Sequence, residues 1–117
     1  MRKESSSSVR VFYPKFDKEE LIQKLKRNLG DLAKELPLSF VVLFGSYAKG
    51  NYTVASDVDL LIVYLGRKRK DAFMVVKKTL DIPLLEPHVY SEDEYERLRE
   101  GIARMIARGI VLFSRKK

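Results

Sequence analysis

The sequence contains no cysteine, which excludes disulfide bonds and thiolate metal sites. It also has no apolar run long enough to cross a bilayer. The first eight residues are charged and rich in serine, which is not the composition of a secretory signal peptide. We therefore expect a cytoplasmic protein without a membrane partner.

Amide side chains are scarce as well, with Gln23, Asn28 and Asn51 as the full set. Together with a charged fraction of 33%, this composition is typical of a protein from a thermophile. The formal net charge is +7, which favours polyanionic partners such as nucleotide phosphates, nucleic acid or an acidic protein face. A solvated, soluble surface would explain the same charge equally well.

The chain has 117 residues, 45% of them hydrophobic, which is enough for one domain with one core. We expect residues 1–16 to form a flexible lead-in with a short strand at 9–13. Residues 17–113 should form the domain, and 114–117 a charged tail.

Three segments have the signals of helices. The first begins with a capping box at Asp17 and Glu20 and stops before Pro37. Its apolar residues recur at helical spacing: Leu21, Ile22, Leu25, Leu29, Leu32, Ala33 and Leu36.

The second helix should be capped by Asp71 and run to about Leu80. Its expected buried residues are Phe73, Met74, Val76 and Leu80. The third begins with a capping box at Ser91 and Glu94 and should continue to about Gly109. Its apolar stripe comprises Tyr95, Leu98, Ile102, Met105 and Ile106.

Strands alternate with these helices. Segments 39–44 and 58–64 are apolar on both faces, which predicts burial on both faces. A third strand within 82–90 contains Pro83 and Pro87, so it should lie at a sheet edge or carry a bulge. Residues 110–113 could add a short final strand. The alternation predicts an α/β domain with one small sheet.

The most informative stretch lies between the first two strands. Gly45-Ser46 ends one apolar run, and Asp57-x-Asp59 opens the next ten residues later. Glycine lets the backbone approach a phosphate, and Ser46 can donate its hydroxyl to a phosphate oxygen. Two carboxylates at i and i+2 of a strand point to one side, where they can bind magnesium. An ordinary turn and a solvated strand start are the alternative interpretation, but four fixed positions match by chance on the order of once in a thousand such chains.

This pattern resembles the nucleotidyltransferase superfamily that includes DNA polymerase beta, and within it the minimal nucleotidyltransferase family. The resemblance implies a palm-like fold, a single small mixed sheet with helices packed on it. It also implies ATP as substrate and two Mg²⁺ ions held by carboxylates. Gly45 and Ser46 match the family's phosphate-holding pair.

The superfamily commonly carries a third carboxylate on a later strand, and Glu86 is the candidate here. The family often has aspartate at this place, so Glu86 is one methylene longer. It would help to hold the metal or accept the proton of the acceptor. The alternative is an exposed glutamate on an edge strand.

Four further features lie near the predicted site. Lys49 could reach a phosphate, and Ser56 could bind nucleotide or orient Asp57, although an exposed lysine and a simple cap explain them as well. His88 follows Glu86 by two residues and could line the site or be structural. The basic run 67–70 could touch an acidic partner or be a solvated loop.

The minimal family is often paired with a helical partner of the HEPN class. The resemblance therefore implies an antitoxin that transfers AMP from ATP to a tyrosine of that partner. A non-catalytic module that neutralises a helical partner is a second hypothesis. Transfer to RNA is a third, less favoured because the sequence shows no basic platform interleaved with aromatic residues.

Overall fold

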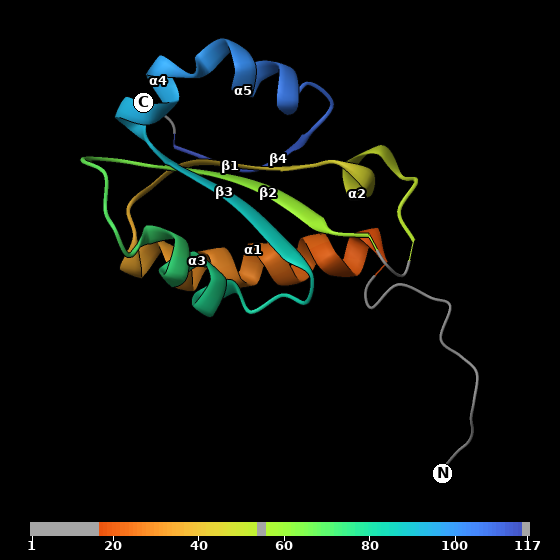
Figure 1. The fold of residues 1–117 in the computed structure, drawn as a ribbon. Coiled ribbons are helices and arrows are strands. Elements are labelled where there is room, and N and C mark those ends of the chain that lie inside the picture. The colour runs from red at the N-terminus through yellow and green to blue at the C-terminus, as the bar shows by residue number, and fades with distance from the viewer. Residues whose placement is uncertain (1–16, 54–55, 116–117) are drawn as a thin grey trace.

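The computed structural model describes residues 17–53 and 56–115 (Figure 1). The strand predicted at 9–13 lies outside these residues. The elements are α1 (Lys18–Glu35), β1 (Leu38–Phe44), α2 (Ser46–Lys49), β2 (Val58–Tyr64), α3 (Ala72–Leu80), β3 (Leu85–Ser91), α4 (Glu92–Arg97), α5 (Arg99–Met105) and β4 (Ile110–Ser114). Among the described residues, no helix combines the length and apolarity needed to span a membrane.

The four strands form one mixed sheet in the order β3-β2-β1-β4. β1 runs antiparallel to both β2 and β4, whereas β2 and β3 are parallel. This confirms the predicted α/β class with a single small mixed sheet. β3 lies at an edge, as its prolines predicted.

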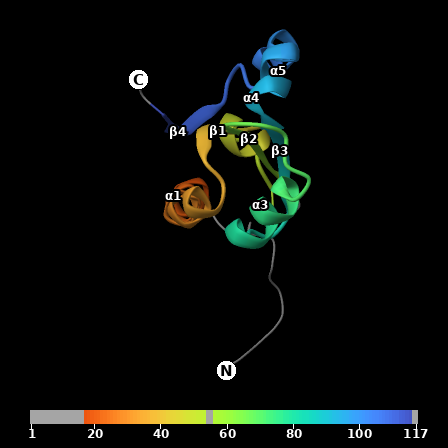
Figure 2. The ribbon, with the colours of Figure 1, turned by 90° about the vertical axis from the view of Figure 1, so that its left-hand side faces the viewer.

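Helices cover both faces of the sheet. Figures 1 and 2 show α1 and α3 on one face and α4 and α5 on the other. Side chains of β1 and β2 alternate between two cores. The larger core lies under α1 and α3, and the smaller one joins Val42, Phe44, Leu61 and Val63 to Ile102 of α5. This arrangement explains why both segments are apolar on both faces.

The capping box of α1 is present as predicted. The Asp17 carboxylate accepts a hydrogen bond from the Glu20 N–H at 2.8 Å, and the Glu20 carboxylate accepts one from the Asp17 N–H at 3.1 Å. The apolar stripe is buried or half-buried, except at Ala33. Ala33 is exposed because it borders a groove between α1 and β4.

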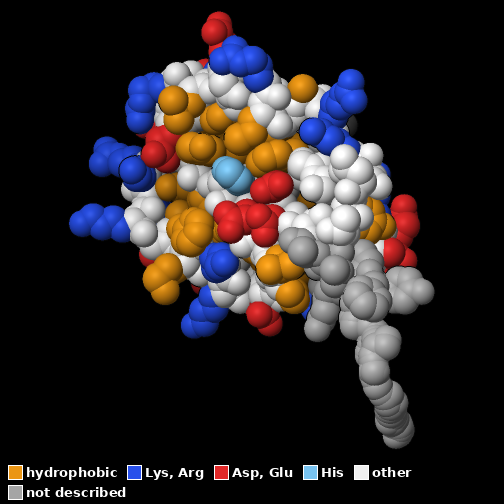
Figure 3. Space-filling view, turned by 45° about the vertical axis from the view of Figure 1, so that its right-hand side comes forward, with side chains coloured by type: hydrophobic (Ala, Val, Ile, Leu, Met, Phe, Trp, Pro, Cys, Tyr) orange, Lys and Arg blue, Asp and Glu red, His pale blue; other side chains and the backbone are white. Residues whose placement is uncertain are grey.

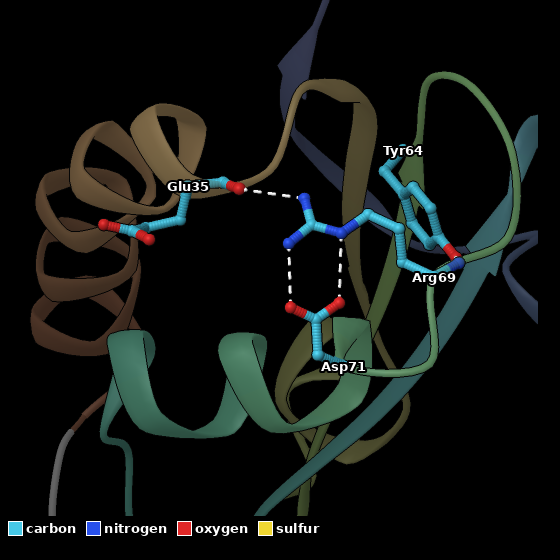
Figure 4. A network of polar contacts seen from close by, with 4 residues as sticks. All are labelled: Glu35, Tyr64, Arg69 and Asp71. Atoms are coloured by element: carbon cyan, nitrogen blue, oxygen red, sulfur yellow. Dashed lines mark hydrogen bonds and ion pairs between the residues drawn. The ribbon is translucent and has the colours of Figure 1, made fainter.

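The position predicted for the cap of α3 is confirmed, but the capping hydrogen bond is absent. Asp71 precedes the helix but makes no side-chain capping bond. Its carboxylate instead accepts hydrogen bonds from Arg69 at 2.9 and 3.0 Å (Figure 4). The Arg69 guanidinium also donates to the Glu35 carbonyl at 3.0 Å, and the backbone N–H of Arg69 donates to the Tyr64 hydroxyl at 2.8 Å. The basic loop therefore joins the end of β2 to the end of α1.

Two further helix predictions are wrong. Phe73 and Met74 are 49% and 72% exposed, because the buried face of α3 is Ala72, Val76 and Leu80 at a spacing of four residues. The last helix is broken at Leu98, which has a φ of −108° and is 49% exposed. The predicted capping box at Ser91 and Glu94 is present.

Candidate functional site

The turn between β1 and α2 lies directly against Asp59. Gly45 has a φ of +78°, in the region that favours glycine. A Cβ atom at this position would collide with the Asp59 carboxylate oxygen Oδ2. The backbone at Gly45 is therefore in van der Waals contact with the carboxylate of Asp59, and only a glycine leaves room for this contact.

Two tyrosines hold the short helix α2 in place. Tyr47 is buried and stacks on Tyr52 with ring centroids 4.3 Å apart. The Tyr52 hydroxyl accepts a hydrogen bond from the Lys18 N–H at 3.0 Å, and the Lys18 ammonium donates to the Ala48 carbonyl at 3.3 Å. The N-terminus of α1 thus fixes the turn. No role was predicted for these tyrosines from the sequence.

The sheet brings the predicted carboxylates together. Asp59 on β2 lies opposite Phe44 at the end of β1 and beside Glu86 on β3. Neighbouring strands are about 4.8 Å apart, so the side chains of Asp59 and Glu86 share one face of the sheet. Asp57 precedes β2 by one residue and is exposed. Figure 3 shows acidic side chains gathered beside the histidine and surrounded by hydrophobic ones.

The electrostatics of Asp59 reflect this crowding. Its pKa is raised above the ordinary value, chiefly because partial burial penalises the charged carboxylate. His88 lowers the pKa, while Asp57 and Glu86 raise it by like-charge repulsion. All three carboxylates therefore belong to one electrostatic cluster that a cation would stabilise.

His88 lies at the border of this cluster. Its Nε2 is 3.9 Å from Oδ1 of Asp59, and its ring packs on Phe44 with centroids 5.2 Å apart. It is two residues beyond Glu86 on the same strand, and its side chain is 35% exposed. The ring therefore packs on the core and also borders the acidic group, and its role at the site stays a prediction.

The remaining predicted residues lie on the turn and its loop. The Ser56 hydroxyl accepts a hydrogen bond from the Thr53 N–H at 2.8 Å, so it closes the loop that leads into β2. Lys49 is exposed in the last turn of α2. Their predicted nucleotide contacts remain predictions.

The donor set suits magnesium. Within the described part of the chain, no group of three or more His, Asp or Glu side chains is placed to hold a metal ion by itself. Magnesium is usually bound by one or two carboxylates together with substrate phosphates and water, rather than by an all-protein cage. A carboxylate with a raised pKa, in contact with a glycine turn, fits that mode of binding.

Residues 13–112 match the nucleotidyltransferase domain family. The chain belongs to this family. Membership confirms the resemblance seen in the sequence and the predicted class of transferase enzyme.

Two proteins from Methanocaldococcus jannaschii are similar over shorter segments. "Putative protein adenylyltransferase MJ0141" is 46% identical over 44 residues, covering 38% of this chain and 43% of the relative. "Putative protein adenylyltransferase MJ1305" is 39% identical over 61 residues, covering 50% and 38%. The matches therefore span less than half the length of either relative.

Solved structures share the fold. A "putative nucleotidyltransferase" from Sulfolobus solfataricus has a TM-score of 0.59 at 24% identity, covering 86% of both chains. A structure described as a toxin-antitoxin with AMP-PNP has a TM-score of 0.54 at 18% identity, covering 78% of this chain and 74% of the other. At these identities the likeness supports the fold alone.

Proposed function

We propose that this chain transfers AMP from a magnesium-bound ATP to a hydroxyl group of a partner protein. One observation carries the proposal: the Gly45 turn touches the Asp59 carboxylate, and Glu86 lies beside it in register. A phosphate-binding turn and metal-binding carboxylates are the two parts that nucleotidyl transfer needs in one place.

In this proposal Asp57 and Asp59 hold the metal together with phosphate oxygens and water, and Glu86 completes the acidic cluster beside Asp59. Bound Mg²⁺ would neutralise charge on the phosphate oxygens and draw the nucleotide to the acidic cluster. Without a cation, the crowded carboxylates would repel the triphosphate as well as each other.

The turn binds the triphosphate. The Gly45 backbone allows close approach, the Ser46 hydroxyl donates to a phosphate oxygen, and Lys49 and Ser56 lie on the adjoining helix and loop. Because Gly45 is held against Asp59, phosphate and metal ligands keep a fixed spacing. Such positioning supplies much of the rate enhancement in phosphoryl chemistry.

The transfer step is a substitution at the α-phosphorus. The acceptor oxygen forms a bond to this phosphorus, the bond from phosphorus to the bridging oxygen breaks, and pyrophosphate leaves. Glu86 takes the proton of the acceptor hydroxyl. Glu86 suits this role because it is exposed at the sheet edge while adjoining Asp59.

We further propose a tyrosine on a helical, HEPN-type partner as the acceptor, which would make this chain an antitoxin. The relatives named as protein adenylyltransferases and the toxin-antitoxin fold neighbours support a protein acceptor. The net charge of +7 is compatible with an acidic partner face.

The test uses ATP labelled in the α-phosphate, magnesium, the purified chain and the product of the neighbouring gene. We expect label to enter the partner and to be lost when Asp57→Ala replaces the natural chain. Asp31→Ala is a matched control, because Asp31 is an exposed aspartate on the helix α1. It should transfer label at the natural rate.

Two outcomes would contradict the proposal. A stable complex that transfers no label, and that Asp57→Ala leaves intact, would identify a non-catalytic binding module. Label that enters only added RNA would identify a nucleic-acid-modifying enzyme instead.

A further inference from the structure

The two edges of the sheet differ in how they are protected. β3 and β4 are the edge strands, and an edge strand presents unpaired N–H and C=O groups that can pair with another chain. On β3 these groups are largely occupied. Pro87 has no N–H, the Leu85 carbonyl accepts from Lys77 at 3.2 Å, and the Ser91 N–H donates to Glu94 at 3.0 Å.

The edge at β4 carries less protection. Within residues 17–53 and 56–115, β4 pairs with β1 alone and has one bulge, between Val111 and Phe113. Val111 is 60% exposed, although it belongs to a largely apolar strand. An exposed β-branched residue on an edge strand favours pairing with a further strand.

An apolar groove adjoins the same edge. It has a volume of 300 Å³ between α1 and β4, and its lining includes Leu29, Ala33 and Phe113. Gly30 also lines it, and a Cβ there would meet nothing within 4 Å. Ala33, from the apolar stripe of α1, is exposed at this groove. A strand added beside β4 could therefore bury one row of the added strand's side chains in the groove.

The segment of sequence that contains β4 carries charge of one sign. Residues 101–117 contain five basic residues and no acidic one: Arg104, Arg108, Arg115, Lys116 and Lys117. Lys26 adds a further positive charge to the groove. A second copy of this chain would bring like charges together, whereas an acidic segment would be attracted.

We propose that the outer edge of β4 binds an extended acidic segment of a partner protein as a fifth strand. Main-chain hydrogen bonds would supply affinity, and alternate side chains would enter the groove or cover Val111. Acidic residues of the segment would face the basic residues that flank β4.

The position of this edge also suits the proposed transfer. Ile110 of β4 lies opposite Leu43, next to the end of β1 that leads into Gly45. A strand added to β4 would lie three strand spacings from β2, or about 14 Å. Residues that follow the docked segment could then reach the acidic cluster. The binding itself does not require that transfer occurs.

The experiment uses peptides of about eight residues, an ordinary strand length, that alternate valine with glutamate or valine with lysine. Binding to the full chain is measured by fluorescence anisotropy, and the site by amide hydrogen exchange. We expect the glutamate peptide to bind and to protect residues 110–114, and the lysine peptide not to bind. Val111→Glu should weaken binding at least about tenfold, because a carboxylate on the edge opposes strand addition and repels the acidic peptide.

Met74→Glu is the matched control, since Met74 is 72% exposed on α3. It should leave peptide binding unchanged, and so should Asp57→Ala, which abolishes transfer in the proposed function. The inference is overturned if both glutamate variants bind alike or if protection maps to α4 and α5. It is also overturned if only a polyuridine oligonucleotide binds this edge, or if sedimentation shows a dimer that Val111→Glu dissociates.

Discussion

At position 45 a single methyl group would displace the Asp59 carboxylate. Gly45→Ala combines the strain of a positive φ with that collision, whereas Gly50→Ala has the strain alone, since nothing lies within 4 Å of a Cβ there. Gly50→Ala should lower the free energy of unfolding by about 1–2 kcal/mol, and Gly45→Ala should lower it further, as measured by urea denaturation. Transfer should fall about 100-fold in Gly45→Ala only, because small misplacements of reacting groups are costly.

Equal activity of these two variants would show that the contact between the turn and the carboxylate is unimportant. Gly50 shares the positive φ, at +87°, but its ψ is 5° whereas that of Gly45 is −152°, a conformation that is still less accessible to alanine.

Asp59 should make stability depend on pH. Its folded-state pKa lies above the ordinary value of 3.8, so ionising it costs more in the folded than in the unfolded chain. Its favourable contribution is therefore present below the ordinary pKa and is lost as pH rises through the folded pKa. The free energy of unfolding of Asp59→Asn should not show this decrease with rising pH.

The measurement is urea denaturation of both proteins between about pH 3.5 and pH 7. The stability of Asp59→Asn relative to the natural chain should increase across this range. A difference that stays constant, or that decreases, would contradict the raised pKa.

At the scale of elements, the start of β4 depends on Gly109. A Cβ at this position would lie 2.9 Å from the Leu43 carbonyl oxygen and 3.1 Å from that of Ile106, and would also collide with Val42. Gly109→Ala should lower the free energy of unfolding by about 1–3 kcal/mol, the usual cost of overpacking. Thermal and urea denaturation would both measure it.

Gly101→Ala is the control for that experiment. Gly101 lies within α5, and a methyl group added there would meet nothing within 4 Å. Alanine should therefore raise the free energy of unfolding by about 0.5–1 kcal/mol. If Gly109→Ala were as stable as Gly101→Ala, β4 would not be packed as described.

Local signals in the sequence predicted several elements well. The capping boxes at Asp17 and Ser91 fix the starts of α1 and α4, because each is complete within four residues. The continuous apolar runs predicted β1 and β2, and the prolines predicted that β3 lies at an edge. These features depend on neighbours in the chain and need no knowledge of the tertiary fold.

The errors arose where contacts made in the folded chain, rather than the helical pattern, decide the outcome. Asp71 has the sequence position of a cap, but Arg69 from the preceding loop takes its carboxylate. Phe73 and Met74 are apolar, yet the face of α3 is set by contacts with α1 and β3. Leu98 fits a helical stripe, but the helix is interrupted at this residue, and its side chain is exposed.

For the site, the sequence predicted Gly45, Asp57 and Asp59 from their spacing alone. It could not show that Gly45 touches Asp59, since that depends on the pairing of β1 with β2. The proximity of Glu86 likewise depends on the parallel register of β2 and β3. The tyrosine pair behind α2 could not be predicted, because it stacks only once the loop has folded back on α1.

At the scale of the whole molecule, the mixed sheet places two surfaces within reach of each other. The acidic cluster of Asp57, Asp59 and Glu86 lies where β1 ends and β2 and β3 begin. The proposed binding edge is β4, which lies one strand beyond β1. A partner held at one surface could therefore present a side chain to the other.

Calorimetric titration of a non-hydrolysable ATP analogue, with magnesium or with EDTA, tests the proposed nucleotide site most directly. We predict binding to the natural chain that requires magnesium and that Asp59→Asn abolishes, while Met74→Lys binds normally. Equal heats of binding in EDTA and in magnesium, or undiminished binding by Asp59→Asn, would contradict it.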